Sequence, residues 1–279
     1  MRGFGQRRAR PHELRIEAYG VGIGITCEPG ALLDGVHAIL PPGWRECSER
    51  KVDASFALTA GEDHRVTVLS GASPVAREVE PRLALGVLDS RIRAEISSRA
   101  REWIFIHAGV VALDDRALAM PGRSFAGKTS LVAALIARGA SYFSDEYAVL
   151  DPDGRVHPYP KPLSFRNSDL RIDTTETSAD ELGAVSAEAS ARIALVAVTS
   201  YRPEADWQPT PGGVADAALA LFEYAVLARS EPQRVMGAVA SAAADARLLE
   251  GDRGEAGETA VALLEALAGA SRTTPSRWP

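Results

Sequence analysis

The chain has 279 residues, 46% of them hydrophobic and 24% charged, a composition typical of a globular protein with one large domain or two modest ones. Its net charge of −6 argues against a nucleic-acid partner, because neutralising phosphates needs a concentrated basic surface. Two cysteines without CxxC spacing and no apolar run of about 18 residues argue against a disulfide framework, a zinc–thiolate site and a membrane span, so we expect a cytoplasmic protein.

The first part of the chain predicts a small β-rich domain over 13–98, after a flexible tail at 1–12. Partly alternating apolar residues predict a strand over 15–27. Three shorter β-like runs follow, separated by turns that contain Pro, Gly or Asp, at 36–40, 55–59 and 65–69. A helix closes this domain, because apolar residues recur every three or four positions. These residues are Leu85, Leu88, Ile92 and Ile96.

The rest of the chain predicts an α/β (mixed α+β) domain over 99–270, followed by a flexible tail at 271–279. Its most apolar run, 103–111, predicts a buried strand that turns at 114–116. Further strands are predicted at 117–120, 141–144, 147–150, 194–199 and near 245–249, and helices at 129–138, 214–229, 232–243 and 256–268. A polar connector covers about 167–190.

Residues 122–129 read GRSFAGKT, which matches the phosphate-binding motif G-x-x-x-x-G-K-[ST] in full. A predicted strand precedes the motif and a predicted helix follows it, as the chemistry requires. Glycines allow close approach of the backbone, and the N–H groups at the helix start can hold phosphate oxygens. We therefore expect ATP phosphates on this loop, with Lys128 as a point charge and Thr129 as a Mg²⁺ ligand. The predicted cofactor-binding residues are Gly122, Arg123, Ser124, Phe125, Ala126, Gly127, Lys128, Thr129 and Ser130.

An acidic pair, Asp145 and Glu146, follows the next predicted strand. A strand–helix–strand crossover places the carboxyl ends of parallel strands beside each other, so the pair should face the loop. One carboxylate would bind Mg²⁺ and the other would orient or deprotonate an acceptor hydroxyl. The sequence leaves open which does which, and an ordinary solvated turn is the alternative reading.

Other candidates carry weaker local signals. His107 lies inside a very apolar predicted strand, where a histidine is more often a satisfied core residue than a catalytic one. Lys161 and Arg166 follow the acidic pair and would suit neutralisation of phosphoryl charge, or would simply line a charged loop. Arg202 and Arg234 are further cations without local support.

Several of these segments resemble the catalytic domain of the HPr kinase/phosphorylase family, including the related kinases of lasso-peptide gene clusters. The matching runs are His107-Ala108-Gly109, 122–130, Arg138-Gly139-Ala140 and Ser144-Asp145-Glu146. The resemblance covers about 100–170, and the first 95 residues do not resemble the family's N-terminal domain. It implies a P-loop core like that of HPr kinases and phosphoenolpyruvate carboxykinases. It also implies catalytic roles for His107, Lys128, Asp145 and Glu146, and a metal site at Thr129, Asp145 and Glu146.

The sequence thus predicts an ATP- and Mg²⁺-dependent kinase that phosphorylates a hydroxyl, such as a serine on a peptide or small molecule. A regulatory ATP-binding protein without transfer chemistry is the alternative, and carboxykinase chemistry would need motifs that the sequence lacks. Asn167 is the only asparagine, so the guanine-reading N-K-x-D motif is absent. We expect an ATP ligand and a peptide, protein or small-molecule acceptor, with no nucleic acid and no membrane. The acceptor and the oligomeric state, a homo-oligomer included, stay open.

Overall fold

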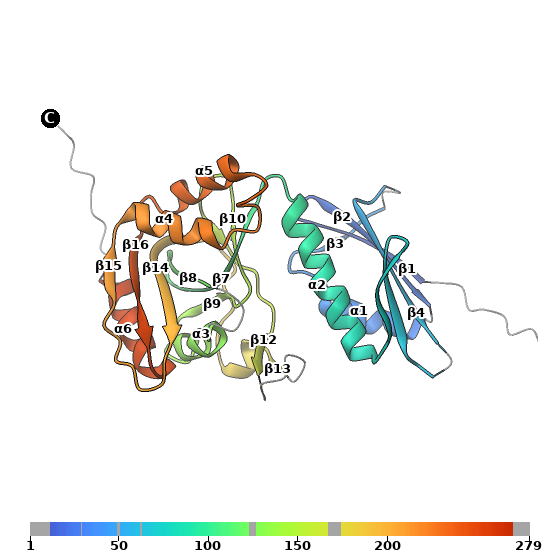
Figure 1. The fold of residues 1–279 in the computed structure, drawn as a ribbon, viewed down its shortest axis with the longest axis horizontal. Coiled ribbons are helices and arrows are strands. Elements are labelled where there is room, and N and C mark those ends of the chain that lie inside the picture. The colour runs from blue at the N-terminus through green and yellow to red at the C-terminus, as the bar shows by residue number, and fades with distance from the viewer. Residues whose placement is uncertain are drawn as a thin grey trace, which may run out of the picture. The chain divides into compact units, whose positions relative to one another are not determined.

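The computed structural model describes residues 12–28, 30–48, 51–61, 63–122, 127–166 and 174–269. The chain divides into two compact units, Met1–Glu102 and Trp103–Pro279. Both combine helices with sheets of mixed strand direction, so the fold class is mixed α/β (Figure 1). No helix in these ranges is long and apolar enough to cross a membrane. The predicted tails at 1–12 and 271–279 lie outside the described residues, apart from His12 at the start of the first strand.

The first unit is a six-stranded sheet in the order β3-β1-β2-β4-β5-β6, in which β2 and β4 are parallel and the other pairs antiparallel. Helix α2 packs against β2, β4, β5 and β6, and α1 packs against α2 (Figure 1). Its elements are β1 (His12–Ala18), β2 (Val21–Glu28), a 3-10 turn (Gly30–Leu32), α1 (Leu33–Ile39), β3 (Arg45–Glu46), β4 (Ala54–Ala60), β5 (Val66–Ser70), β6 (Ser73–Val79) and α2 (Pro81–Arg99).

Two sequence expectations in this unit are wrong. The predicted strand at 15–27 is a hairpin, because Tyr19 and Gly20 both take positive φ (54° and 76°), the backbone of a tight two-residue turn. The predicted β-run at 36–40 is the end of α1, which stops just before Pro41. The expected closing helix is present as α2, which begins with Pro81 at its first turn and buries Ala84, Leu88, Ile92 and Ile96.

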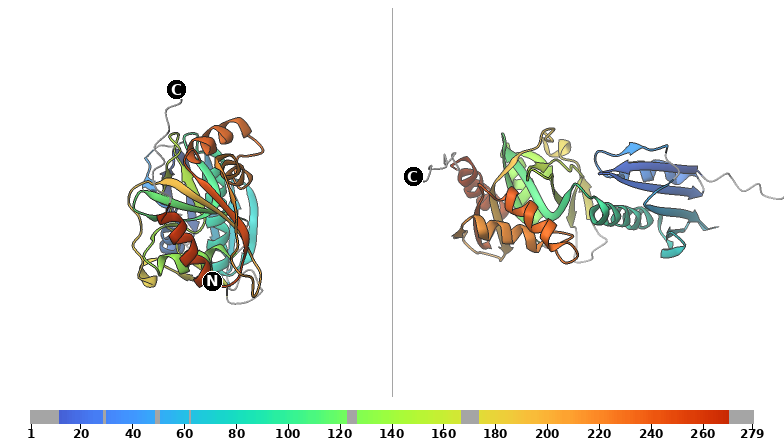
Figure 2. Two further views of the ribbon diagram at one scale, coloured as in Figure 1. Left: turned by 90° about the vertical axis from the view of Figure 1, so that its left-hand side faces the viewer. Right: turned by 90° about the horizontal axis from the view of Figure 1, so that it is seen from above.

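The second unit is built on an eight-stranded sheet in the order β11-β10-β7-β8-β14-β16-β15, with β9 also paired to β7. Figure 2 gives two further views of this sheet and its helices. Its elements are β7 (Ile104–Leu113), β8 (Arg116–Pro121), α3 (Lys128–Ile136), β9 (Ser141–Ser144), β10 (Tyr147–Leu150), β11 (Val156–His157), β12 (Leu163–Arg166), β13 (Thr174–Thr177), a 3-10 turn (Asp180–Leu182), β14 (Arg192–Tyr201), β15 (Thr210–Gly212), α4 (Val214–Glu223), α5 (Pro232–Ala242), β16 (Arg247–Arg253) and α6 (Ala256–Ala268).

Two hydrophobic cores lie on the two faces of this sheet. One contains residues of α4 and α5, such as Leu221 and Val239, against alternate residues of β7 such as Ile106. The other contains residues of α3 and α6, such as Leu131 and Leu263. Helices therefore cover both faces, which leaves the carboxyl ends of the parallel strands as the place for a ligand.

Strand β7 organises the sheet in a way that the sequence did not predict. The strands before and after α3, β8 and β9, run in the same direction but are not neighbours, because both pair antiparallel to β7, which lies between them. Their carboxyl ends still meet at one edge, since Pro121 pairs with Ala108 and Ser144 with Val110. The expectation of adjacent parallel strands is wrong, but both strands end on the same short stretch of β7.

The predicted helix at 214–229 is also too long. Helix α4 ends at Glu223, and the next residues run along β7: the His107 amide donates to the Tyr224 carbonyl (2.9 Å), and the Val226 amide to the Phe105 carbonyl (2.9 Å). Beyond Pro121, β8 no longer covers this edge of β7, so the backbone groups of β7 need other partners.

The strand expected near 245–249 is β16 and extends to Arg253. The described part of the expected connector contains β13 and a 3-10 turn.

Gly154 in the second unit provides a stability prediction. Its φ is +81°, and a Cβ there would lie 2.6 Å from the backbone nitrogen of Ala242. Gly154→Ala should therefore lower the free energy of unfolding by roughly 2–4 kcal/mol, because it adds a backbone clash to left-handed strain. Gly183→Ala is the control, since its φ is +71° but nothing lies within 4 Å of the added Cβ. Urea unfolding should show a clearly larger loss at Gly154, and equal losses would contradict this reading.

Candidate active site

The carboxyl end of β8 leads through Gly122 to the start of α3, and Gly127 is the N-cap of that helix. The Gly122 amide donates to the His107 carbonyl (3.1 Å), which anchors the loop to β7. Gly127 takes a left-handed conformation (φ 75°, ψ 19°) that favours glycine. The first-turn amides of α3 have no acceptor within the helix and can receive an anion. The predicted ligands Arg123, Ser124, Phe125 and Ala126 lie outside the described residues.

Lys128 is the first residue of α3, and its ammonium donates to the Gly122 carbonyl just after the end of β8 (2.9 Å). Burial lowers the pKa of Lys128, and the charges of Asp145 and Glu146 oppose this shift. The ammonium is thus partly desolvated beside two carboxylates. A cation in this position has more to gain from an incoming anion than a fully hydrated lysine has.

The acidic pair occupies the break between β9 and β10, which both pair with β7. The buried Ser144 hydroxyl accepts hydrogen bonds from the amides of Glu146 (3.0 Å) and Tyr147 (2.9 Å). These bonds hold the chain in a tight local turn. The Ala108 amide also donates to the Glu146 carbonyl (3.3 Å). The break is therefore a fixed feature of the sheet, and it sets the position of Asp145.

Asp145 connects this break to α3. The Thr129 hydroxyl donates to Asp145 Oδ2 (2.7 Å), whereas Oδ1 is buried and has no hydrogen-bond partner in the described part of the chain. Burial raises the pKa of Asp145 to about 7, Thr129 and Lys128 counter the rise, and Glu146 adds to it. A buried carboxylate oxygen without a partner is costly unless a cation or proton donor arrives.

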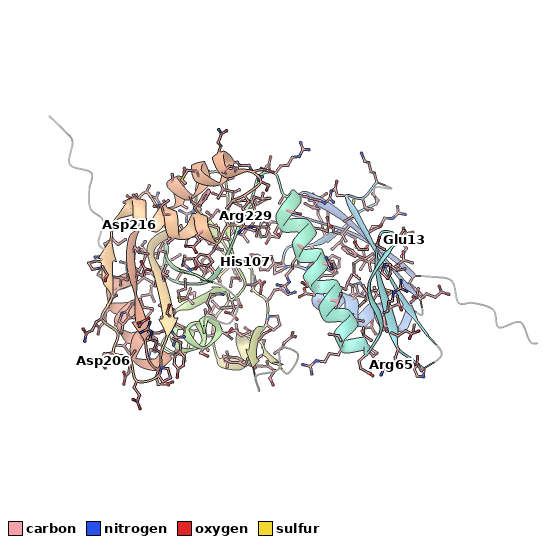
Figure 3. All side chains as sticks on the ribbon, viewed as in Figure 1. Glu13, Arg65, His107, Asp206, Asp216 and Arg229 are labelled. Atoms are coloured by element: carbon pink, nitrogen blue, oxygen red, sulfur yellow. The ribbon has the colours of Figure 1, made fainter. Side chains whose placement is uncertain are left out.

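His107 lies on β7, where it pairs with Tyr147 of β10, and Figure 3 labels it in the second unit. Its ring lies 4.8 Å from the Tyr147 ring, between centroids. Two residues further along the same strand face, a Cβ at Gly109 would lie 3.9 Å from the Cβ of Lys128 and only 2.7 Å from Val132. Gly109 thus lets α3 pack closely on β7, and this places His107 on the sheet face near the start of the helix.

Of the residues predicted from sequence, Lys128, Thr129 and Asp145 are brought together by direct contacts or close charge interactions, and Glu146 couples to this group through its charge. Ser130 lies exposed in the first turn of α3.

The other candidate cations have different surroundings. Arg234 bonds to Glu231 and the Trp103 carbonyl, Arg202 pairs with Asp252, and the side chain of Arg166 lies outside the described part.

Sequence reasoning missed Arg253, the last residue of β16. Its side chain is only 2% exposed, and its guanidinium donates to the carbonyls of Gly127 (2.8 Å) and Gly254 (3.0 Å). Its Nε atom is buried without a hydrogen-bond partner in the described residues. Burial lowers the pKa of Arg253, and the nearby Glu255 and Tyr201 oppose this shift. A Cβ at Gly127 would lie 2.3 Å from its Nη2, so the loop glycine also makes room for this arginine.

Topology explains why Arg253 reaches the loop. Strands β8, β14 and β16 are parallel neighbours, so their carboxyl ends, and the loops that follow, meet at one edge of the sheet. Recognising a third parallel strand that ends at Arg253, next to Gly254 and a following helix, would have predicted its place. The strand predicted near 245–249 stops short of this residue.

A Mg²⁺ ion fits the residues at this edge. Asp145 Oδ1 is a buried oxygen without a hydrogen-bond partner in the described ranges, and the Thr129 hydroxyl lies beside the same carboxylate. The described residues contain no group of three or more His, Cys, Asp or Glu that could hold a metal by themselves. Mg²⁺ is commonly held by one or two carboxylates together with substrate phosphates and water, so a full protein cage is not required.

Comparisons with known proteins give limited similarity. No protein-family model matches the sequence, and no curated protein matches it. Among solved structures, the Hpr(Ser) kinase/phosphatase from Coxiella burnetii is similar over 59% of this chain and 93% of that chain, at 15% sequence identity and a TM-score of 0.33. This TM-score does not establish a shared fold or activity, so a functional assignment depends on the geometry of the site.

Proposed function

We propose that this chain is an ATP-dependent kinase that transfers the γ-phosphoryl group to a hydroxyl, such as a serine on a peptide or small molecule. One observation carries the proposal: Asp145 meets Thr129 at the first turn of α3 (2.7 Å), and its other carboxylate oxygen is buried without a hydrogen-bond partner among the described residues. A helix N-terminus with a lysine, a hydroxyl and such a carboxylate supplies what a nucleotide phosphate with its metal requires. The nucleotide-binding catalytic domain would span 99–270 and include all of these residues.

The phosphates would lie at the start of α3, held by its first-turn amides and by Lys128. In this role Lys128 would exchange the Gly122 carbonyl for phosphate oxygens. Arg253 would be the second cation, because its guanidinium already contacts the Gly127 carbonyl from within the sheet edge. Fixed positive charges of this kind stabilise the charge that spreads over a transferring phosphoryl group.

Asp145 and Thr129 would hold Mg²⁺, which neutralises charge on the phosphates when bound. This assignment leaves Glu146 as the group that accepts the proton of the acceptor hydroxyl. The acceptor oxygen would then form its bond to the γ-phosphorus as the bond to the ADP oxygen breaks. His107 lies on β7 beside Tyr147, near the start of α3, and would orient the acceptor.

Transfer of label from γ-labelled ATP tests the proposal directly. The purified chain would be incubated with Mg²⁺, labelled ATP and a panel of free serine, serine-containing peptides and HPr. We expect label on one acceptor class, and a loss of roughly a hundredfold or more in Lys128→Ala, because a fixed charge on the transferring group is removed. Arg138→Ala is the matched control, since Arg138 bonds to a carbonyl at the far end of α3.

Two outcomes would contradict the proposal. Tight ATP binding that depends on Lys128, without label on any acceptor, would favour a regulatory nucleotide-binding protein. Equal transfer by wild type and Lys128→Ala would place the chemistry elsewhere.

A further inference from the structure

In the proposed reaction, the two reaction partners must lie on opposite sides of the γ-phosphate. The acceptor oxygen attacks in line with the ADP oxygen that leaves, so the nucleoside points away from the acceptor. Asp145, Glu146 and His107 lie along β7 and its partners β9 and β10, on one side of β8. On the other side of β8 are the ends of β14 and β16. The nucleoside is therefore directed toward Tyr201 and Arg253, which pair in register at those two ends.

Tyr201 presents an aromatic surface at this point. Its residue is 48% exposed, one of the largest exposures among the described bulky apolar residues, although it ends a strand whose middle is buried. Its Cβ lies 4.0 Å from the position of a Cβ built on Gly127, so the side chain starts directly beside the N-cap of α3. An exposed aromatic residue next to a phosphate-binding helix start is well placed for the base of a nucleotide.

The ring of Tyr201 is also held in place. The guanidinium carbon of Arg253, which is only 2% exposed, lies 5.4 Å from the ring centroid, and the Tyr201 hydroxyl donates to Glu255 (3.2 Å). A buried cation therefore contacts the ring while about half of the residue remains open to solvent. A ring fixed in this way loses little conformational freedom when a planar ligand stacks on it.

We propose that Tyr201 is the stacking platform for the purine base of the nucleotide. This inference rests on the proposed kinase function. Stacking uses the flat surface of the base, and the strength of the interaction increases with the area of that surface. A purine triphosphate should therefore bind better than a pyrimidine triphosphate. Tyr201 by itself would not distinguish adenine from guanine, because both present a purine face.

Calorimetric titration of three proteins with two ligands tests this role. Wild type, Tyr201→Ala and Tyr201→Phe would each be titrated with Mg²⁺–ATP and with Mg²⁺–tripolyphosphate, which has the phosphates but no base. Tyr201→Ala should weaken ATP binding by roughly tenfold to a hundredfold and leave tripolyphosphate binding unchanged. Tyr201→Phe keeps the ring and should bind ATP within about threefold of wild type, since only the hydrogen bond to Glu255 is lost. Competition between ATP and CTP should show a purine preference in wild type that Tyr201→Ala loses.

The other patterns overturn the inference in distinct ways. Unchanged ATP affinity in Tyr201→Ala would show that the base binds elsewhere. An equal loss for ATP and tripolyphosphate would mean that Tyr201 supports the loop and does not stack. Wild-type protein that binds neither ligand would overturn the kinase proposal, and the stacking inference with it.

Discussion

Asp145→Asn is expected to reduce phosphoryl transfer by on the order of a thousandfold while leaving the fold intact. In the proposed reaction a bound metal would contribute several kcal/mol of charge stabilisation, and each 1.4 kcal/mol corresponds to about tenfold in rate. Asparagine keeps the size of the side chain and can still accept the hydrogen bond from Thr129, but it replaces the buried carboxylate with a neutral amide. Single-turnover transfer at saturating ATP would measure the loss.

The same variant should be more stable than wild type in the absence of metal and nucleotide. Burial raises the pKa of Asp145 from 3.8 to about 7, so the folded state favours the protonated carboxyl. The folded state then binds more protons than the unfolded state between these values, and wild-type stability falls as the pH rises from about 4 to about 7. At pH 8 the cost of ionised Asp145 would reach about 4 kcal/mol, at roughly 1.4 kcal/mol per pKa unit. Asparagine does not ionise and avoids this cost.

Urea unfolding with a chelator at pH 5 and pH 8 would check the stability effect. The advantage of Asp145→Asn over wild type should be largest at pH 8 and shrink toward pH 4. Asp153→Asn, at an exposed turn, is the control for removing a carboxylate elsewhere and should show no comparable trend. A stability difference that does not vary with pH would mean that folding does not raise the free-energy cost of ionising Asp145.

Arg253→Lys is expected to reduce transfer by roughly a hundredfold to a thousandfold. The planar guanidinium reaches the carbonyls of Gly127 and Gly254 at once, a geometry that a single ammonium cannot reproduce. The positive charge is conserved, so a loss of activity would reflect the position of the charge relative to the loop. Arg247→Lys, at the other end of β16, is the matched control, because Arg247 is exposed and bonds only to the Ala266 carbonyl among the described contacts.

Two readouts separate a catalytic role of Arg253 from a structural one. Thermal unfolding by circular dichroism should show that Arg253→Lys remains folded at the assay temperature. The affinity for ATP should fall far less than the single-turnover rate, because transition-state charge is the main quantity affected. Wild-type transfer rates in Arg253→Lys would remove this arginine from the proposed mechanism.

Much of the local structure could be predicted because its causes lie within short segments. The four-residue spacing of Leu88, Ile92 and Ile96 produces α2, and the apolar run at 103–111 produces β7. The glycines and lysine of 122–129 predict a turn between a strand and a helix. Helix α3 begins at Lys128, the helix start that this motif predicts. Errors arose where one turn residue decided the outcome, as at Tyr19-Gly20, or where a neighbour overrode local propensity, as at Tyr224.

The assembly of the site was decided only by the tertiary structure. Asp145 reaches Thr129 because β7 inserts between β8 and β9, and Arg253 reaches Gly127 because β16 runs parallel to β14 and ends at the same sheet edge. Arg253 is 126 residues from Gly127 in the chain. No pattern within β16 indicates that its last residue contacts a segment so distant in the sequence. Residue type and spacing alone predicted a phosphate-binding loop at 122–129. Which side chains surround that loop depends on strand order and register, which are long-range properties of the sheet.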